Sequence, residues 1–188
     1  MQIDRNRSER GDDAPATTAK HSDDDDKLER FTRSVTINRA SADLYNFWRD
    51  FSNLPEIMDN IASITVVDNL LSEWVAKGPA GSEVKWRSRV TEDIEGTLIS
   101  WRSDDDAEVF NEGRITFAAA QGDRGTVVTV LIGYDPPAGF VGRVMAKILQ
   151  REPEVQLRRD LRRFKQLMET GEIATNVRNL AQLADEGK

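Results

Sequence analysis

Residues 82–103 read SEVKWRSRVTEDIEGTLISWRS, and this stretch decides the fold class. In its first half, apolar or small residues alternate with charged ones, at Val84, Trp86, Ser88 and Val90. Alternation with period two predicts a strand that has one face in water and the other against a core. A turn at 95–96 then precedes a second segment rich in β-branched and aromatic residues, so the stretch indicates an antiparallel hairpin.

The same pattern of short strands continues on both sides of this hairpin. Turn residues such as Asp68-Asn69 and Gly78-Pro79-Ala80-Gly81 separate the segments. We therefore expect one strand before a helical region and six after it, over residues 31–37, 61–68, 71–77, 82–93, 97–103, 112–119 and 126–134. Consecutive strands with short connections form an antiparallel meander.

The helical region after the first strand carries apolar residues at helical spacing. Leu44, Phe47, Trp48 and Phe51 predict a helix over 41–51, and Ser41 stands where an N-cap is expected. A short helix restarts near Pro55 and ends near Asn60.

Two further apolar stripes with helical spacing follow the last strand. The first runs over 140–149, and the second begins at Pro153 and ends at a C-cap, Gly171. A sheet with one apolar face needs a cover, and this C-terminal helical segment is the only element long enough to provide it. The sequence therefore predicts an α+β fold, a curved antiparallel sheet of about seven strands wrapped on a long C-terminal helix.

The 188 residues suit one domain with tails better than two domains. Residues 1–29 lack aromatic side chains and contain four consecutive aspartates, so we expect a disordered acidic tail. Its DDDDK run fits a protease tag site as well as a natural tail. We expect the folded domain over 30–171 and a loosely attached tail over 172–188.

The residue types of the chain exclude several kinds of chemistry. It has no cysteine, and its one histidine, His21, lies in the polar N-terminal region. Disulfides, thiolate nucleophiles, Ser-His-Asp triads and zinc sites that contain histidine are therefore excluded, and we expect no cofactor.

Charge and hydropathy limit the partners and the location. The formal net charge of −7 argues against nucleic-acid binding. No apolar run approaches the roughly 18 residues of a transmembrane helix. The N-terminus also lacks the apolar segment of a secretory signal, so a cytoplasmic location is the default expectation.

Six segments carry a resemblance to a known family: VTINRASADLYNFWRDFSNLPEIM (35–58), WVAKGPAG (74–81), VKWRSRVTED (84–93), ISWRS (99–103), GTVVTVLIGYDPP (125–137) and DLRRFKQLMETGEI (160–173). The chain resembles the polyketide cyclase/dehydrase and coenzyme Q-binding START-like proteins, within the wider Bet v 1/START superfamily. The resemblance implies a helix-grip fold with an internal cavity for a hydrophobic small molecule. Function must still come from the site, because this superfamily holds carriers as well as enzymes.

Aromatic residues on the expected strands are candidates for the cavity wall. Trp86, Trp101 and Tyr134, if they point inward, would supply flat apolar walls and one phenolic hydroxyl. The same residues could instead form a filled core. The expected pocket-lining residues are Trp86, Trp101, Phe117, Tyr134, Met145 and Phe164.

Three functions follow, and the first is preferred. The chain would bind or carry a hydrophobic small molecule such as a quinone, a polyketide-like aromatic or a lipid. Alternatively, it would be a polyketide cyclase or aromatase that works by positioning its substrate, with Glu112 as a candidate acid or base. A third alternative is a module that contacts a protein or the ribosome through the arginines of 158–165, although a solvated helix face explains these arginines better.

The stripe over 140–149 has two interpretations. Arg143 and Lys147 flank its apolar face, so in a lipid carrier it could gate the pocket and touch a membrane surface transiently. The preferred interpretation is that it only packs on the sheet. The sequence leaves the oligomeric state open.

Overall fold

The computed structural model of the chain describes residues 28–78, 81–107, 110–134 and 153–173. The elements follow in the order β1 (Glu29–Ile37), α1 (Ser41–Arg49), the 3-10 helix η2 (Phe51–Glu56), β2 (Ile61–Val66), β3 (Leu71–Lys77), β4 (Glu83–Ile94), β5 (Leu98–Ser103), β6 (Asn111–Ala119), β7 (Thr126–Tyr134) and α3 (Pro153–Thr170). This order confirms the predicted strand, two short helices, six strands and C-terminal helix. The stripe over 140–149, including Met145, lies outside the described residues, as do most of both tails.

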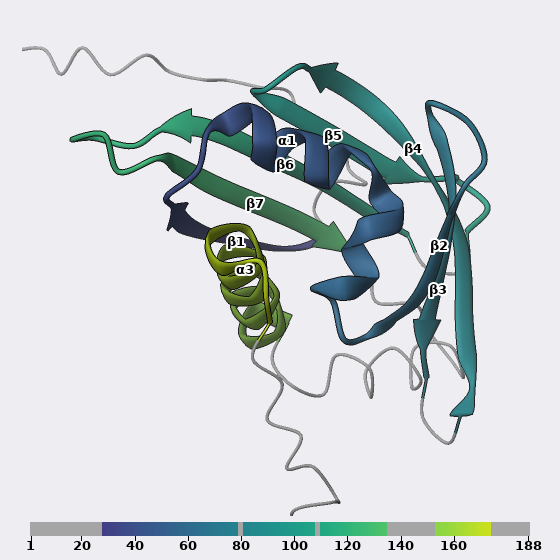
Figure 1. Cartoon of the computed structure of the whole chain (residues 1–188). Helices are drawn as coiled ribbons and strands as arrows, with labels where there is room; N and C mark the ends of the chain where they lie inside the picture. The colour runs from purple at the N-terminus through teal and green to yellow at the C-terminus, as the bar shows by residue number, and fades with distance from the viewer. Residues whose placement is uncertain (1–27, 79–80, 108–109, 135–152, 174–188) are drawn as a thin grey trace, which may run out of the picture.

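The strands form one curved sheet in the order β1-β7-β6-β5-β4-β3-β2, in which every neighbouring pair is antiparallel. Figure 1 shows α1 and η2 lying across one face of this sheet and α3 standing beside β1. We call the face that the helices cover the inner face. The fold is the helix-grip fold that the sequence predicts.

Alternation along the strands places apolar side chains on the inner face and charged ones on the outer face. On β4, Val84, Ser88 and Val90 are buried while the residues between them are exposed or partly exposed. A β-bulge between Val90 and Glu92 shifts the register by one residue, so that Asp93 pairs with the buried Ile99 and joins the inner face.

Each helix among the described residues contributes apolar side chains to the core against the inner face. The largest fully buried residues include Trp48 and Leu44 from α1, Leu54 from η2 and Phe164 from α3. Leu157 and Leu161 are also buried, at the helical spacing that the sequence predicts for the C-terminal stripe. This burial confirms that α3 covers part of the sheet.

The predicted N-cap of α1 is wrong by one residue, although the helix begins at residue 41 as predicted. Ala40 occupies the N-cap in an extended conformation, without a side-chain hydrogen bond, and Ser41 is already the first helical residue. The extended conformation of Asp50 ends α1, and the Asp50 carboxylate accepts a hydrogen bond from the Ser52 amide to begin η2. The helical region is therefore divided earlier than the apolar spacing predicts.

β2 also ends earlier than predicted, at Val66. The Asp68 carboxylate accepts hydrogen bonds from the amides of Leu70 and Leu71, at 2.7 and 2.8 Å, and so fixes the β2–β3 turn. These bonds lower the pKa of Asp68 below its usual value.

None of the helices described by the structure is both long and apolar enough to cross a membrane.

Candidate functional site

Two tryptophans from the predicted set lie in one aromatic cluster on the inner face. Trp101 on β5 is 9% exposed, and its ring lies at a centroid distance of 6.4 Å from Phe51 of η2. Trp86 on β4 stacks on Trp74 of β3 at 5.7 Å with an interplanar angle of 22°, and Trp74 in turn meets Phe51 at 5.8 Å. We call Phe51, Trp74, Trp86 and Trp101 the aromatic cluster.

Gly113 makes room for one wall of the aromatic cluster. It pairs with Trp101 across β5 and β6, and a Cβ atom added at Gly113 would overlap carbons of the indole ring. The ring therefore lies directly against the backbone of β6. Only glycine permits this close approach.

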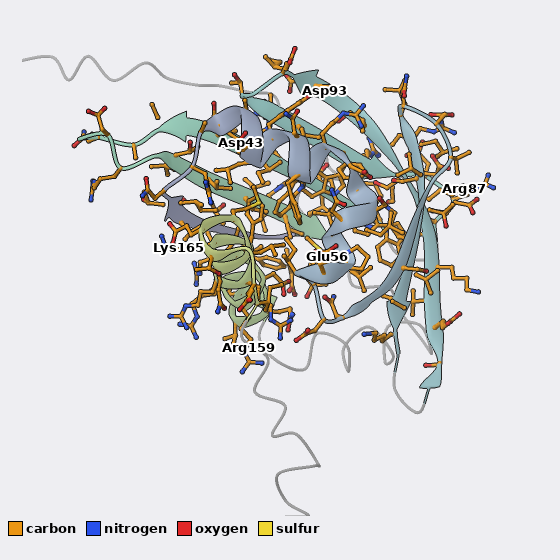
Figure 2. The ribbon with its side chains drawn as sticks, in the orientation of Figure 1. Asp43, Glu56, Arg87, Asp93, Arg159 and Lys165 are labelled. Atoms are coloured by element: carbon orange, nitrogen blue, oxygen red, sulfur yellow. The ribbon has the colours of Figure 1, made fainter. Side chains whose placement is uncertain are left out.

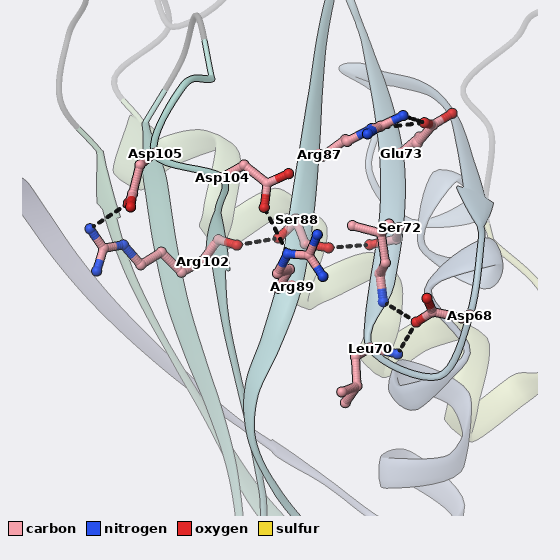
Figure 3. Close-up of polar contacts among 11 residues, drawn as sticks. Asp68, Leu70, Ser72, Glu73, Arg87, Ser88, Arg89, Arg102, Asp104 and Asp105 are labelled. Atoms are coloured by element: carbon pink, nitrogen blue, oxygen red, sulfur yellow. Dashed lines mark hydrogen bonds and ion pairs between the residues drawn. The ribbon is translucent and has the colours of Figure 1, made fainter.

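A row of buried serines runs beside the aromatic cluster. Ser72, Ser88 and Ser103 occupy neighbouring positions on β3, β4 and β5. The Ser72 hydroxyl accepts a hydrogen bond from Trp74 Nε1 at 2.9 Å. The Ser88 hydroxyl donates to the Arg102 carbonyl at 3.3 Å, as Figure 3 shows. These hydroxyls thus already have structural partners.

The indole nitrogen of Trp86 differs from that of its neighbour. Trp86 Nε1 is buried, and no described residue accepts its hydrogen bond. A buried donor without a partner is rare in proteins and costs stability. The aromatic cluster therefore offers one free hydrogen-bond donor beside flat apolar surfaces.

The remaining predicted residues lie outside the aromatic cluster. Phe117 is buried and packs edge to face on Tyr45 of α1 at 6.1 Å. Phe164 packs between α3 and α1. The centroid of its ring lies 5.2 Å from that of Phe47 and 5.3 Å from that of Trp48.

Tyr134 stands at the far end of the inner face. Its hydroxyl donates to Glu29 of β1 at 2.6 Å. Burial, the hydrogen bond and the negative charge of Glu29 raise the pKa of Tyr134 to about 12. The phenolic hydroxyl thus fastens β1 to β7.

A second group of titratable side chains on the inner face lies where α1 meets β4. The Asp93 carboxylate accepts hydrogen bonds from the Tyr45 hydroxyl at 2.5 Å and from Arg49 Nε at 2.6 Å. Burial, and next the hydrogen bond from the Tyr45 hydroxyl to Asp93, raise the pKa of Tyr45 to about 12. Arg49 also donates to the Asn69 carbonyl at 2.7 Å, so the set holds α1 to the β2–β3 turn.

The charged candidates lie on the outer face. Glu112 forms an ion pair with Arg30 at 3.3 Å, on the sheet face opposite to the aromatic cluster. Arg102 pairs with Asp105, and Arg87 and Arg89 pair with Glu73 and Asp104 in the same way (Figure 3). The geometry therefore separates Glu112 from the apolar site that an acid or base would need to serve.

Two hollows of the described surface lie among polar and charged side chains. One of about 470 Å³ lies at the start of α1 and the β6–β7 turn, and one of about 400 Å³ lies on the outer face among charged side chains such as Lys85 and Asp106. A crevice of about 10 Å³, lined by Phe51, Ser72 and Val90 among others, adjoins the aromatic cluster. Apolar ligands favour aromatic walls with few polar groups, so the aromatic cluster is the candidate site.

The sequence analysis missed Phe51, Trp74 and the serine row. Trp74 shares one face of LSEWVAK with Ser72 and Ala76, by the same period of two that selected Trp86. The small polar residues at inward positions were a further indication. Phe51 could not be placed, because its contact with two strands depends on how η2 crosses the sheet.

The fold and this apolar inner face define a helix-grip protein with a candidate site for a hydrophobic ligand. The family described as polyketide cyclase / dehydrase and lipid transport matches residues 37–162, and the chain belongs to it. No curated protein matches the chain.

Solved structures share the fold. The Deinococcus radiodurans protein DR_A0006 is 35% identical, with a TM-score of 0.63 over 77% of this chain and 99% of that one. The Zhui aromatase/cyclase of Streptomyces sp. R1128 is 12% identical, with a TM-score of 0.58 over 78% and 99%. TTHA0849 of Thermus thermophilus is 21% identical, with a TM-score of 0.57 over 74% and 94%. Family membership supports hydrophobic-ligand binding or a cyclase role, without distinguishing them.

Proposed function

We propose that the protein binds a hydrophobic small molecule at the aromatic cluster and carries it without changing it chemically. The observation that supports this most is the stacked pair of Trp74 and Trp86, in which one indole donor is satisfied and the other is free. Flat rings bind flat apolar molecules, and a free N–H pairs with an acceptor oxygen. A quinone or a polyketide-like aromatic ketone suits this site better than a fatty acid.

Carriage is preferred to catalysis because the aromatic cluster holds no acid or base. The serine hydroxyls beside it are engaged in the sheet, Asp93 is held by Tyr45 and Arg49, and Glu112 lies on the other face. A cyclase that only positions its substrate would remain compatible with this geometry. Native mass spectrometry of the protein from its host distinguishes carriage from catalysis. We expect the mass of a retained molecule to be the same before and after incubation with the protein, whereas a changed mass would favour the cyclase.

Two matched variants test the role of the free donor. Trp86→Phe keeps an aromatic ring and removes the N–H. Trp48→Phe removes another buried N–H without a described partner, but in the packing between α1 and α3. A hydrogen bond to a ligand oxygen contributes about 0.5–1.5 kcal/mol, so Trp86→Phe should weaken binding of 1,4-naphthoquinone roughly 2- to 12-fold.

The measurement is quenching of tryptophan fluorescence in a titration with 1,4-naphthoquinone. Trp48→Phe should bind like the wild type. Equal losses in both variants would place the ligand elsewhere. A panel of quinones, fatty acids and aromatic polyketides that all fail to bind the wild type would leave the interaction module as the better function.

A further inference from the structure

The two sides of α3 are attached to the domain in different ways. The side toward β1 is fastened by several polar contacts: the ion pair of Arg33 with Glu154, Lys165 Nζ to the Thr36 carbonyl at 2.7 Å, the Asn38 amide to Glu169 at 2.7 Å, and Arg39 Nε to the Met168 carbonyl at 2.5 Å. Figure 2 shows Lys165 on α3 and, on the other side of the helix, Glu56 at the end of η2. The β1 side can therefore act as a hinge.

The other side of α3 meets the loop 57–60 between η2 and β2. Within the described residues, one ion pair joins them, between Arg163 and Asp59. We call this contact the seam. Asn60, at the end of the same loop, has a buried Oδ1 that no described residue satisfies. Within the described residues, opening of the seam therefore breaks one ion pair, whereas the polar contacts on the β1 side stay in place.

Asp160 lies at the seam, on the buried stripe of α3. It is 6% exposed, and Gln156 donates to its carboxylate at 2.8 Å. Burial raises the pKa of Asp160 to about 7, and Asp59 across the seam adds to the rise, while the hydrogen bond from Gln156 and the charges of Arg163 and Arg159 oppose it. Lys77 is another cation beside the loop, and its Nζ donates a hydrogen bond to the Asp59 carbonyl.

Once ionised, Asp160 therefore competes with Asp59 for the guanidinium of Arg163. A buried carboxylate with one neutral partner needs a cation or water. Arg163 lies one helical turn away on the same helix, but the closed seam uses its guanidinium to hold Asp59. If Arg163 turns to Asp160, the link between α3 and the loop 57–60 is lost.

We propose that the seam between α3 and the loop 57–60 is closed while Asp160 is protonated and opens when Asp160 ionises, with the β1 side as hinge. Opening lifts α3 from the loop and admits a hydrophobic ligand to the inner face. The ligand step rests on the proposed function, but the opening itself does not. Acid closes the seam, and neutral pH opens it.

Hydrogen exchange followed by mass spectrometry on the full chain tests the opening. Exchange of amides in α3 and 57–60, corrected for intrinsic rates, is measured from pH 5 to 8.5 in the wild type and in Asp160→Asn. The opening constant should rise nearly tenfold per pH unit from pH 5 and level off above about 7, because only the closed state holds the proton. Asp160→Asn should give a flat profile, and Arg158→Gln, an exposed control, should follow the wild type.

Asp59→Asn provides a second variant in case Asp160→Asn does not fold. It frees Arg163 for Asp160, so the levelling-off should move to lower pH and the opening constant at pH 5 should increase. A flat wild-type profile, or the same slope in Asp160→Asn, would overturn the proposal.

Stopped-flow mixing with 1,4-naphthoquinone tests the ligand step separately. Association should be faster at pH 7.5 than at pH 5.5 in the wild type and equal at both in Asp160→Asn. If the exchange profile behaves as expected but the quinone never binds, the proposed function fails and the seam proposal stands. If the quinone binds and exchange is independent of pH, the seam proposal fails alone.

Discussion

Replacing Asp160 by Asn should stabilise the protein at neutral pH. Asn keeps the shape of the carboxyl and can accept the hydrogen bond from Gln156, but it carries no charge to bury. The pKa of Asp160 rises on folding from 3.8 to about 7. That rise corresponds to about 4 kcal/mol of stability, at about 1.4 kcal/mol for each tenfold change in proton affinity.

The sign of the pH dependence follows from the direction of this pKa change. The folded state binds the Asp160 proton more tightly than the unfolded state, so the wild type loses stability as pH rises from about 4 to about 7. The two proteins should therefore unfold alike near pH 4, and Asp160→Asn should gain up to about 4 kcal/mol by pH 8. Urea denaturation at several pH values, followed by tryptophan fluorescence, gives the difference directly. A difference that does not change with pH, or a wild type that is more stable at pH 8, would refute the argument.

Three other predictions concern packing and the limits of the domain. Leu161→Ala or Phe164→Ala should each lower the free energy of unfolding by about 2–5 kcal/mol, because both side chains are buried. Arg162 is exposed, so Arg162→Ala should change the free energy of unfolding by less than about 0.5 kcal/mol. Losses below about 0.5 kcal/mol at both buried positions would mean that α3 does not cover the sheet. Gly113→Ala should displace the Trp101 ring, cost about 1–3 kcal/mol and alter the fluorescence spectrum, and an unchanged spectrum would contradict the packing of Trp101 on β6. Deleting residues 1–27 should leave the melting temperature within a few degrees, and a loss of cooperative unfolding would instead show that this segment belongs to the domain.

The strands could be predicted because each local pattern agrees with the final environment. Val84, Ser88 and Val90 face the core in the structure as their alternation requires, and the β3, β6 and β7 segments lie within a residue of their predicted bounds. The N-cap of α1 was missed because side-chain preference favours serine over alanine at this position, whereas Ala40 occupies it. The cap there rests on backbone geometry rather than on a side chain.

The site was harder to predict because its residues meet only through tertiary structure. Trp101 and Trp86 come from different strands, and their common cluster depends on strand register, on Phe51 from η2 and on the absence of a side chain at Gly113. Asp160 stands among the arginines of 158–165, which the sequence analysis assigns to a solvated helix face. Its position one turn from both Leu157 and Phe164 did indicate the buried stripe, but a carboxyl there contradicts the usual preference for apolar residues.

The fit of the Trp101 ring against the β6 backbone has a consequence for how the family can vary. Because a side chain at 113 and an indole at 101 cannot occupy the same space, a change at one position constrains the other. Relatives that keep tryptophan at 101 should keep glycine at 113, whereas those with a small residue at 101 are free to place a side chain on β6. The two positions should therefore covary across an alignment, and their combination would sort relatives by the shape of the wall that they present.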